Sequence, residues 1–165
     1  MHYQPQRDLL QNRIILVTGA SDGIGREAAT TYAQYGAEVL LMGRNEQKLR
    51  DAAEAIHQQG YPLPRWFILD LASATPQQCE EVAGQIGAQV PRLDGVLHNA
   101  GALGEVRPMI EQTPQRWLEV MQVNVNATFF LTQALLPLLL KSDSGSLVFT
   151  SSSVGRQGRA GWGAY

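Results

Sequence analysis

The sequence predicts an α/β fold with a doubly wound parallel sheet, formed by one domain that spans residues 1–165. Five short apolar runs alternate strictly with four segments of helical character, which is the pattern of parallel strands joined by crossover helices. A polar residue or a glycine turn follows each apolar run. No linker, charge block, internal repeat or low-complexity tract interrupts this order, so nothing in the sequence divides the chain.

The first predicted elements are a strand, a helix and a second strand. Residues 14–17 are apolar and rich in β-branched side chains, and a glycine turn follows them, as in a strand buried on both faces. Residues 23–35 follow as a helix that Gly36 closes, and residues 39–42 form the second strand. This order is the opening of a parallel sheet.

The middle of the chain adds two helices and a strand. Asn45 can cap a helix that stops at Gly60. Residues 66–69 form the third strand. Thr75 and Pro76 then open the next helix, with a cap followed by a proline at the first helical position.

The remaining elements are two strands with a long helix between them. Residues 93–97 form the fourth strand. Thr113 and Pro114 repeat the cap-and-proline opening for a helix that reaches about residue 140, and residues 146–150 form the fifth strand. Glycines crowd the stretch that follows, which predicts a loop.

Composition favours a cytoplasmic protein without nucleic-acid or membrane partners. The 13 basic and 15 acidic side chains leave a net charge of −2, which argues against a surface for polyanions. Cys79 is the only cysteine, so no disulfide forms within the chain, and acidic neighbours do not activate its thiol. The N-terminus lacks the order of a signal peptide, and the apolar stretch 127–140 is too short to span a membrane.

Candidate ligand-binding residues follow all five strands. Gly19 follows the first strand, Arg44 the second, Asp70 the third, Asn99 the fourth and Ser152 the fifth. The carboxyl ends of parallel strands meet at one edge of a sheet, and doubly wound folds bind ligands in the crevice at that edge. The coincidence of these residues predicts a binding crevice in a Rossmann-like fold.

The turn after the first strand has the composition of a phosphate-binding loop. Its glycines allow a sharp turn and close approach of a ligand or a helix, and the helix start presents free N–H groups to a pyrophosphate. Hydroxyl groups at Thr18 and Ser21 are further candidate donors. A purely structural turn is the alternative, but the four later strand-end residues favour a dinucleotide. The turn reads Thr18-Gly19-Ala20-Ser21-Asp22-Gly23-Ile24-Gly25.

From about residue 12 to Tyr165, the sequence resembles the short-chain dehydrogenase/reductase family. That resemblance implies an NAD(P)-binding Rossmann-type domain and an oxidoreductase that transfers hydride between a nicotinamide cofactor and a small carbonyl or alcohol substrate. It also implies a homo-oligomer. The matching motifs, in order, are Thr18-Gly19-x-x-x-Gly23-x-Gly25, Asp70-Leu71, His98-Asn99-Ala100-Gly101, Val123-Asn124-Val125, Ser152 and Tyr165.

The resemblance implies cofactor-binding roles for the residues after the third and fourth strands. Asp70 would hydrogen-bond the adenine ring with help from the backbone of Leu71, although Asp70 could instead be a helix cap. Asn99 would lie beside the adenine ribose, and Ala100 and Gly101 would line the cofactor cleft. His98 stands where the family usually has Asn, and we expect it to be structural, with no metal partner.

Three residues would carry catalysis. Asn124 would interrupt the long helix and hold a water in a proton relay, Ser152 would orient the substrate carbonyl, and Tyr165 would be the general acid or base. A tyrosine is a poor base at neutral pH unless a cation lies nearby, and in the family this cation is a lysine four residues later. The chain ends before that lysine and before the family's last strands, so we expect the 165-residue chain alone to have little activity.

Cofactor choice depends on the end of the second strand. Dehydrogenases that use NAD normally place an acid there to bind the ribose hydroxyls, whereas an arginine accommodates the 2′-phosphate of NADP. Here Arg44 and Asn45 follow the strand, with no acid before Glu46, which favours NADP(H) over NAD(H). Arg44 could instead be a solvent-exposed loop residue. The alternative to an enzyme is a non-catalytic NADP(H)-binding or sensing protein of the same fold.

Overall fold

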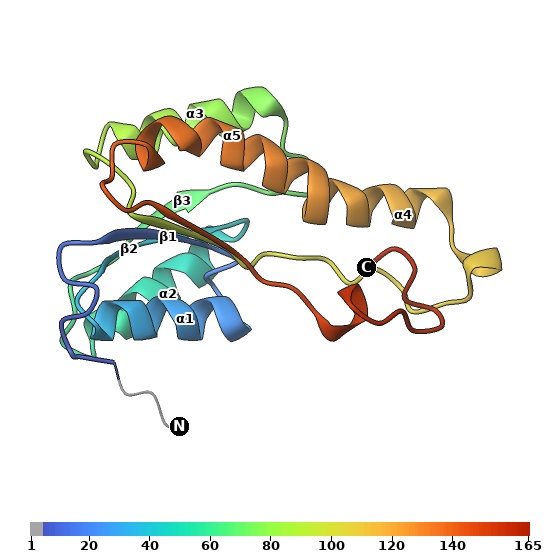
Figure 1. Cartoon of the computed structure of the whole chain (residues 1–165), viewed down its shortest axis with the longest axis horizontal. Coiled ribbons are helices and arrows are strands. Elements are labelled where there is room, and N and C mark those ends of the chain that lie inside the picture. The colour runs from blue at the N-terminus through green and yellow to red at the C-terminus, as the bar shows by residue number, and fades with distance from the viewer. Residues whose placement is uncertain (1–4) are drawn as a thin grey trace.

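The computed structural model describes residues 5–165, and it consists of a parallel sheet with helices on both faces (Figure 1). Its five strands lie in the order β3-β2-β1-β4-β5, so the chain reverses direction across the sheet after β3. This arrangement confirms the predicted doubly wound fold. The strands are β1 (Ile14–Thr18), β2 (Glu38–Gly43), β3 (Arg65–Ile68), β4 (Gly95–His98) and β5 (Ser146–Phe149).

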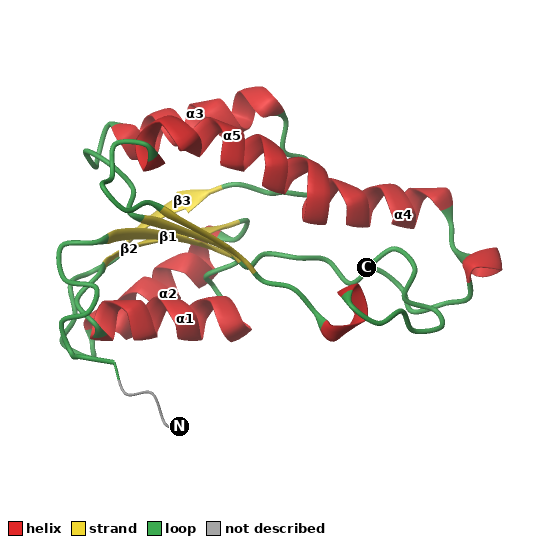
Figure 2. Cartoon of the chain, viewed as in Figure 1, coloured by secondary structure: helices red, strands yellow, loops and turns green. Residues whose placement is uncertain are grey.

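Two pairs of helices cover the sheet (Figure 2). Helices α1 (Gly23–Gln34) and α2 (Glu46–His57) lie on one face, and α3 (Pro76–Gly87) and α5 (Ala127–Leu139) pack side by side on the other. Helix α4 (Pro114–Met121) continues the direction of α5 past the carboxyl ends of the strands. Single turns of 3₁₀ helix lie at Met109–Glu111 and Ser153–Gly155.

Strand β1 is buried on both faces, which explains its uninterrupted apolar sequence. Ile14 and Leu16 belong to the core shared with α3 and α5, whereas Ile15 and Val17 belong to the core shared with α1 and α2. Side chains alternate along a strand, so a continuous apolar run serves both cores. The glycine turn that follows β1 therefore rests on the most buried strand of the sheet.

Capping side chains set where the helices begin. Asn45 accepts a hydrogen bond from the Lys48 N–H at 3.0 Å, as the sequence predicts for the start of α2. Thr75 forms a capping box with Gln78 at the start of α3, and Thr113 caps α4. Asn45 and the N-cap of α1, Asp22, fix the two helix starts that border the candidate site.

The fourth strand begins at Gly95, later than the predicted residue 93, and Asp94 just before it bonds both neighbouring strands through its backbone. Its carboxylate accepts hydrogen bonds from the Ile14 N–H at 2.9 Å and the Ser142 hydroxyl at 2.6 Å. Burial raises the pKa of Asp94, but these hydrogen bonds and one from Arg92 outweigh that effect and lower the pKa to about 2. Asp94 thus ties β1, β4 and the segment before β5 together.

Strand β5 and helix α5 both expose apolar surface. Strand β5 forms an edge of the sheet, and Leu147, Val148 and Phe149 are 37–52% exposed. The outward face of α5 carries Phe129 and Leu136, seven residues apart, which are 60% and 38% exposed. Within residues 5–165, every helix is too short or too polar to cross a membrane.

Candidate functional site

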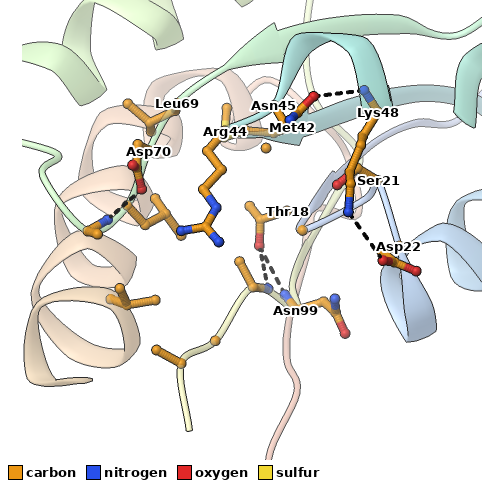
Figure 3. A pocket seen from close by; sticks show the side chains of 18 residues that line it. Thr18, Ser21, Asp22, Met42, Arg44, Asn45, Lys48, Leu69, Asp70 and Asn99 are labelled. Atoms are coloured by element: carbon orange, nitrogen blue, oxygen red, sulfur yellow. Dashed lines mark hydrogen bonds and ion pairs between the residues drawn. The ribbon is translucent and has the colours of Figure 1, made fainter. Parts of the chain in front are cut away.

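A cleft of about 580 Å³ lies at the carboxyl ends of the strands, where the sequence predicts a binding crevice (Figure 3). Segments that follow β1, β2, β3 and β4 form its walls, although they are far apart in the sequence. Its lining residues are Thr18, Gly19, Ser21, Asp22, Met42, Gly43, Arg44, Asn45, Lys48, Leu69, Asp70, Leu71, Ala72, Asn99, Ala100, Gly101, Ala102 and Val123.

The glycine turn is built for close approach of backbone segments. Gly19 has a φ of 63° and Gly23 a φ of 51°, which are left-handed conformations that favour glycine. At Gly25, a Cβ atom would overlap the Gly19 carbonyl and would lie 2.6 Å from Asn99 Nδ2. Only glycine therefore lets the first turn of α1 pack against the end of β4. Gly23, Ile24 and Gly25 do not themselves line the cleft.

Thr18 links the glycine turn to the segment after β4. Its side chain is buried, and its Oγ1 accepts hydrogen bonds from the N–H groups of Asn99 and Ala100 at 3.0 and 3.1 Å. The hydroxyl donates to the Leu97 carbonyl at 3.4 Å. These contacts position the cleft walls relative to each other. The role of Thr18 as a donor to a phosphate stays a prediction.

The start of α1 faces the cleft. Asp22 is the N-cap of this helix, and its carboxylate accepts a hydrogen bond from the Gly23 N–H at 2.8 Å. Its other oxygen lies 3.8 Å from the ammonium of Lys48 on α2 (Figure 3). The sequence does not predict Lys48 and Asn45 as site residues. Their one signal is their place at the start of the helix that follows Arg44.

Arg44 extends from the end of β2 into the cleft (Figure 3). Among residues 5–165, no carboxylate lies within ion-pair distance of its guanidinium. The neighbouring Glu46 pairs with Arg50 at 3.1 Å. The cationic side chain is therefore free to meet an anionic group.

The segment after β3 forms another wall of the cleft. The Asp70 carboxylate accepts a hydrogen bond from the Ala72 N–H at 3.0 Å, which closes a tight turn two residues long. Leu71 is buried, and its carbonyl accepts a hydrogen bond from the Gln122 side chain at 3.4 Å. Asp70 therefore shapes the turn and also lines the cleft. Its predicted contact with adenine stays a prediction.

Asn99, Ala100 and Gly101 lie where β4 opens into the cleft. The side-chain oxygen of Asn99 accepts a hydrogen bond from the Thr150 hydroxyl at 3.3 Å, so this residue joins the ends of β4 and β5. The Ala100 backbone would lie 3.0 Å from a Cβ atom placed on Gly19. This wall therefore packs directly on the glycine turn.

Asn124 interrupts the long helix, as the resemblance implies. It lies in a π-helical turn, Gln122–Asn126, which joins α4 to α5. Its side-chain oxygen accepts the Ala102 N–H at 2.8 Å, and its amide nitrogen donates to the Ala102 carbonyl at 2.9 Å. The side-chain amide of Asn124 thus bonds both backbone groups of Ala102, as a neighbouring strand would, and it fixes the loop after β4. A π turn of this kind often marks a functional site.

Ser152 and Tyr165 lie in the segment after β5, and neither lines the cleft. Ser152 is half-buried and precedes the 3₁₀ turn, whereas Tyr165 is 43% exposed and packs edge-on against Trp162, with ring centroids 5.9 Å apart. Within the described residues, no hydrogen bond joins Ser152, Tyr165 and Asn124. Their common catalytic role stays a prediction.

His98 is structural in its contacts. Its ring stacks on Phe149 at a centroid distance of 4.9 Å, and its Nε2 lies 3.0 Å from the Thr132 hydroxyl. Burial lowers the pKa of His98 to about 4, so the ring is neutral at pH 7. Burial, and then the charge of Glu80, raises the pKa of the Cys79 thiol, as expected for an unreactive cysteine.

Residues 13–165 match the short chain dehydrogenase family. The chain is 71% identical over its full length to the uncharacterized oxidoreductase YciK of Escherichia coli K12 and spans 66% of that relative. It is 36% identical to the short chain dehydrogenase mpl6 of Monascus purpureus and spans 53% of it.

A solved structure of a short chain dehydrogenase from Escherichia coli CFT073, complexed with NADPH, is 70% identical to the chain. The two superpose with a TM-score of 0.96, and the match covers 98% of this chain and 67% of the other. The chain thus spans between about half and two thirds of these relatives.

Proposed function

The chain belongs to the short chain dehydrogenase family, and we propose that the protein is an oxidoreductase that transfers hydride reversibly between NADP(H) and a carbonyl or alcohol compound. The observation that carries the proposal is the cleft in which the glycine turn, the start of α1 and Arg44 meet. Its position at the carboxyl ends of parallel strands is the position of dinucleotide sites in doubly wound folds.

The residues of the cleft fit a dinucleotide with a 2′-phosphate. Gly19 presents bare backbone to the cleft, and the N-cap of α1 in the cleft wall brings the positive end of the helix dipole close to it. Arg44 adds a planar cation that suits a phosphate, and no acid of the chain pairs with it in the described residues. The NADPH complex of the 70% identical relative supports the same choice of cofactor.

When bound, the cofactor would supply or accept the hydride, and the chain's residues would position the reactants and move the proton. We assign proton transfer to the Tyr165 hydroxyl and orientation of the substrate oxygen to the Ser152 hydroxyl. Asn124 would hold the loop after β4 through Ala102 and would bind a relay water near it. Negative charge on the substrate oxygen is the feature that these donors would stabilise.

For the 165-residue chain on its own, we propose that turnover is low. Ser152 lies three residues after the end of β5, and all four residues of this edge strand are exposed. A catalytic serine needs a rigid support, because misplacement by about 1 Å can cost a hundredfold in rate. Turnover is therefore best compared between this chain and a form extended to the length of the Escherichia coli relative.

The assignment of Tyr165 is tested in that extended form with a panel of carbonyl compounds, by following NADPH oxidation. We expect Tyr165→Phe to abolish reduction of every compound that the unmodified protein reduces, because the proton donor is lost while the ring is kept. Binding of NADPH is expected to remain unchanged. Retained turnover in Tyr165→Phe would refute the role of Tyr165, and a protein that binds NADPH without any turnover would favour the sensing alternative.

We also propose that the protein self-associates through α5. This helix is apolar on both sides, since Leu131 and Leu135 face the core while Phe129 and Leu136 face outward. An exposed apolar helix face commonly marks an interface. Light scattering that gives the mass of a single chain at micromolar concentration would contradict this proposal.

A further inference from the structure

We propose that Lys48 is a second cation for the 2′-phosphate of the cofactor, acting beside Arg44, and that Asp22 competes for it. This inference rests on the proposed use of NADP(H). It goes further by assigning a specificity-determining role to a residue that neither the motifs nor the end of β2 single out.

The position of Lys48 is fixed by the start of α2. Asn45 is the N-cap of this helix and accepts the backbone N–H of Lys48, so Lys48 lies in the first helical turn. Arg44, Asn45 and Lys48 all line the cleft; in Figure 3, Lys48 lies beside Ser21 and Asp22, and Arg44 faces them. A phosphate between Arg44 and Ser21 would therefore be within the reach of a lysine side chain on α2.

The present partner of Lys48 holds it weakly. The ammonium lies 3.8 Å from the Asp22 carboxylate, and the two side chains are 59% and 81% exposed. An exposed ion pair of this kind contributes little to stability. The Asp22 carboxylate also has an independent partner in the Gly23 N–H at 2.8 Å. Lys48 can therefore turn from Asp22 to a phosphate at small cost.

Asp22 makes a second cation useful. Its carboxylate lies in the wall of the same cleft, where it would repel the negative charge of a 2′-phosphate. Arg44 comes from the end of β2, whereas Lys48 reaches the carboxylate of Asp22 itself. An ammonium that moves from Asp22 toward the phosphate would still lie near that carboxylate, and its charge would offset the repulsion.

The experiment measures dissociation constants of NADPH, NADH and adenosine 2′,5′-bisphosphate for the chain and five variants at low ionic strength. Lys48→Ala is expected to weaken NADPH and the bisphosphate about tenfold and NADH less than twofold, because only the first two carry the 2′-phosphate. Lys141→Ala, which removes the chain's other lysine, is expected to leave all three constants unchanged.

Asp22→Asn tests the competition. Asparagine keeps an acceptor for the helix cap, so the fold is preserved, while the competing negative charge is removed. We expect Asp22→Asn to tighten NADPH severalfold with little effect on NADH. In a Lys48→Ala background, Asp22→Asn is expected to give a smaller gain, because it relieves only the repulsion of the phosphate and no longer releases an ammonium.

The outcomes separate this inference from the proposed function. If neither the unmodified chain nor its extended form binds a dinucleotide, the proposed function fails. If it binds NADPH and Arg44→Ala weakens that binding, but Lys48→Ala changes it less than twofold, the proposed function stands and the inference on Lys48 is wrong. If Lys48→Ala weakened the binding of NADPH and NADH equally, the assigned role of Lys48 would also be wrong, because the effect would be structural.

Discussion

Gly25 is the residue at which the cleft tolerates the least change. A Cβ atom there would overlap the Gly19 carbonyl and approach Asn99 Nδ2, and the backbone atoms of the turn cannot move without disturbing the cleft wall. The three glycines of the turn are therefore not equivalent. Gly23 is needed for its backbone conformation, Gly25 is needed for space, and Gly19 is needed for both.

We therefore predict that Gly25→Ala destabilises the protein by about 1–3 kcal/mol, as overpacking does, and weakens NADPH binding by more than tenfold. Urea unfolding and fluorescence titration measure the two effects. Gly84→Ala is the matched control, because nothing lies within 4 Å of a Cβ atom at this exposed position in α3. Its stability should be equal or slightly higher, since alanine favours helix. If Gly25→Ala changed neither the free energy of unfolding nor the affinity for NADPH, the turn would be able to relax around the added methyl group.

At the same scale, the sequence predicts the identity of most cleft residues but not their contacts. Thr18 and Asp70 have polar side chains at strand ends, which is a signal that a sequence can give. Their hydrogen bonds to Asn99, Ala100 and Ala72 depend on the folded geometry. Lys48 was missed because its approach to Asp22 joins the starts of two different helices.

At the scale of elements, strand and helix order follows from apolar runs, caps and glycines, and the structure confirms that order. Two boundaries were less predictable. Strand β4 begins at Gly95 rather than residue 93, and the side chain of Asp94, which accepts the Ile14 N–H, gives no sequence signal for that start. The π turn at Gln122–Asn126 has no hydrophobic period of its own, and only the resemblance indicated the interruption at Asn124.

In the segment after β5, the sequence motif identifies residues but does not predict how their side chains are oriented. A thirteen-residue offset between Ser152 and Tyr165 identifies both residues in the family motif, but the offset does not orient either hydroxyl. In the structure, the Tyr165 ring packs on Trp162, and the Arg107 N–H donates to the Gly161 carbonyl at 2.9 Å, which holds this loop against the loop after β4. The position of this loop depends on long-range contacts.

At the scale of the whole molecule, the buried His98 couples stability to pH. Its pKa is about 4 in the folded protein and about 6.5 when unfolded, so as the pH falls through 6.5 the unfolded chain binds a proton that the folded protein does not. Folding stability is therefore lost between about pH 6.5 and pH 4. The lowered pKa of Asp94 affects folding stability at more acidic pH, where stability is lost as the pH falls from about 4 to 2.

We predict that the free energy of unfolding falls by about 2 kcal/mol between pH 7 and pH 4.5 through His98. His98→Asn, which places the usual family residue at this position, is expected to lose less over the same range, because it has no group that titrates there. Urea unfolding of both proteins at the two pH values gives the difference, in which other titrating groups cancel. Equal losses in the two proteins would show that His98 binds its proton while folded.

The central claim is that the cleft binds NADP(H) in preference to NAD(H) because Arg44, rather than an acid, follows β2. The most direct test is a titration of the protein with NADPH and with NADH, repeated with Arg44→Ala. We predict tighter binding of NADPH, with a loss of tenfold or more for NADPH in the variant and little change for NADH, since charge-assisted hydrogen bonds to the 2′-phosphate are lost. Equal or tighter binding of NADH by the unmodified protein would contradict the account.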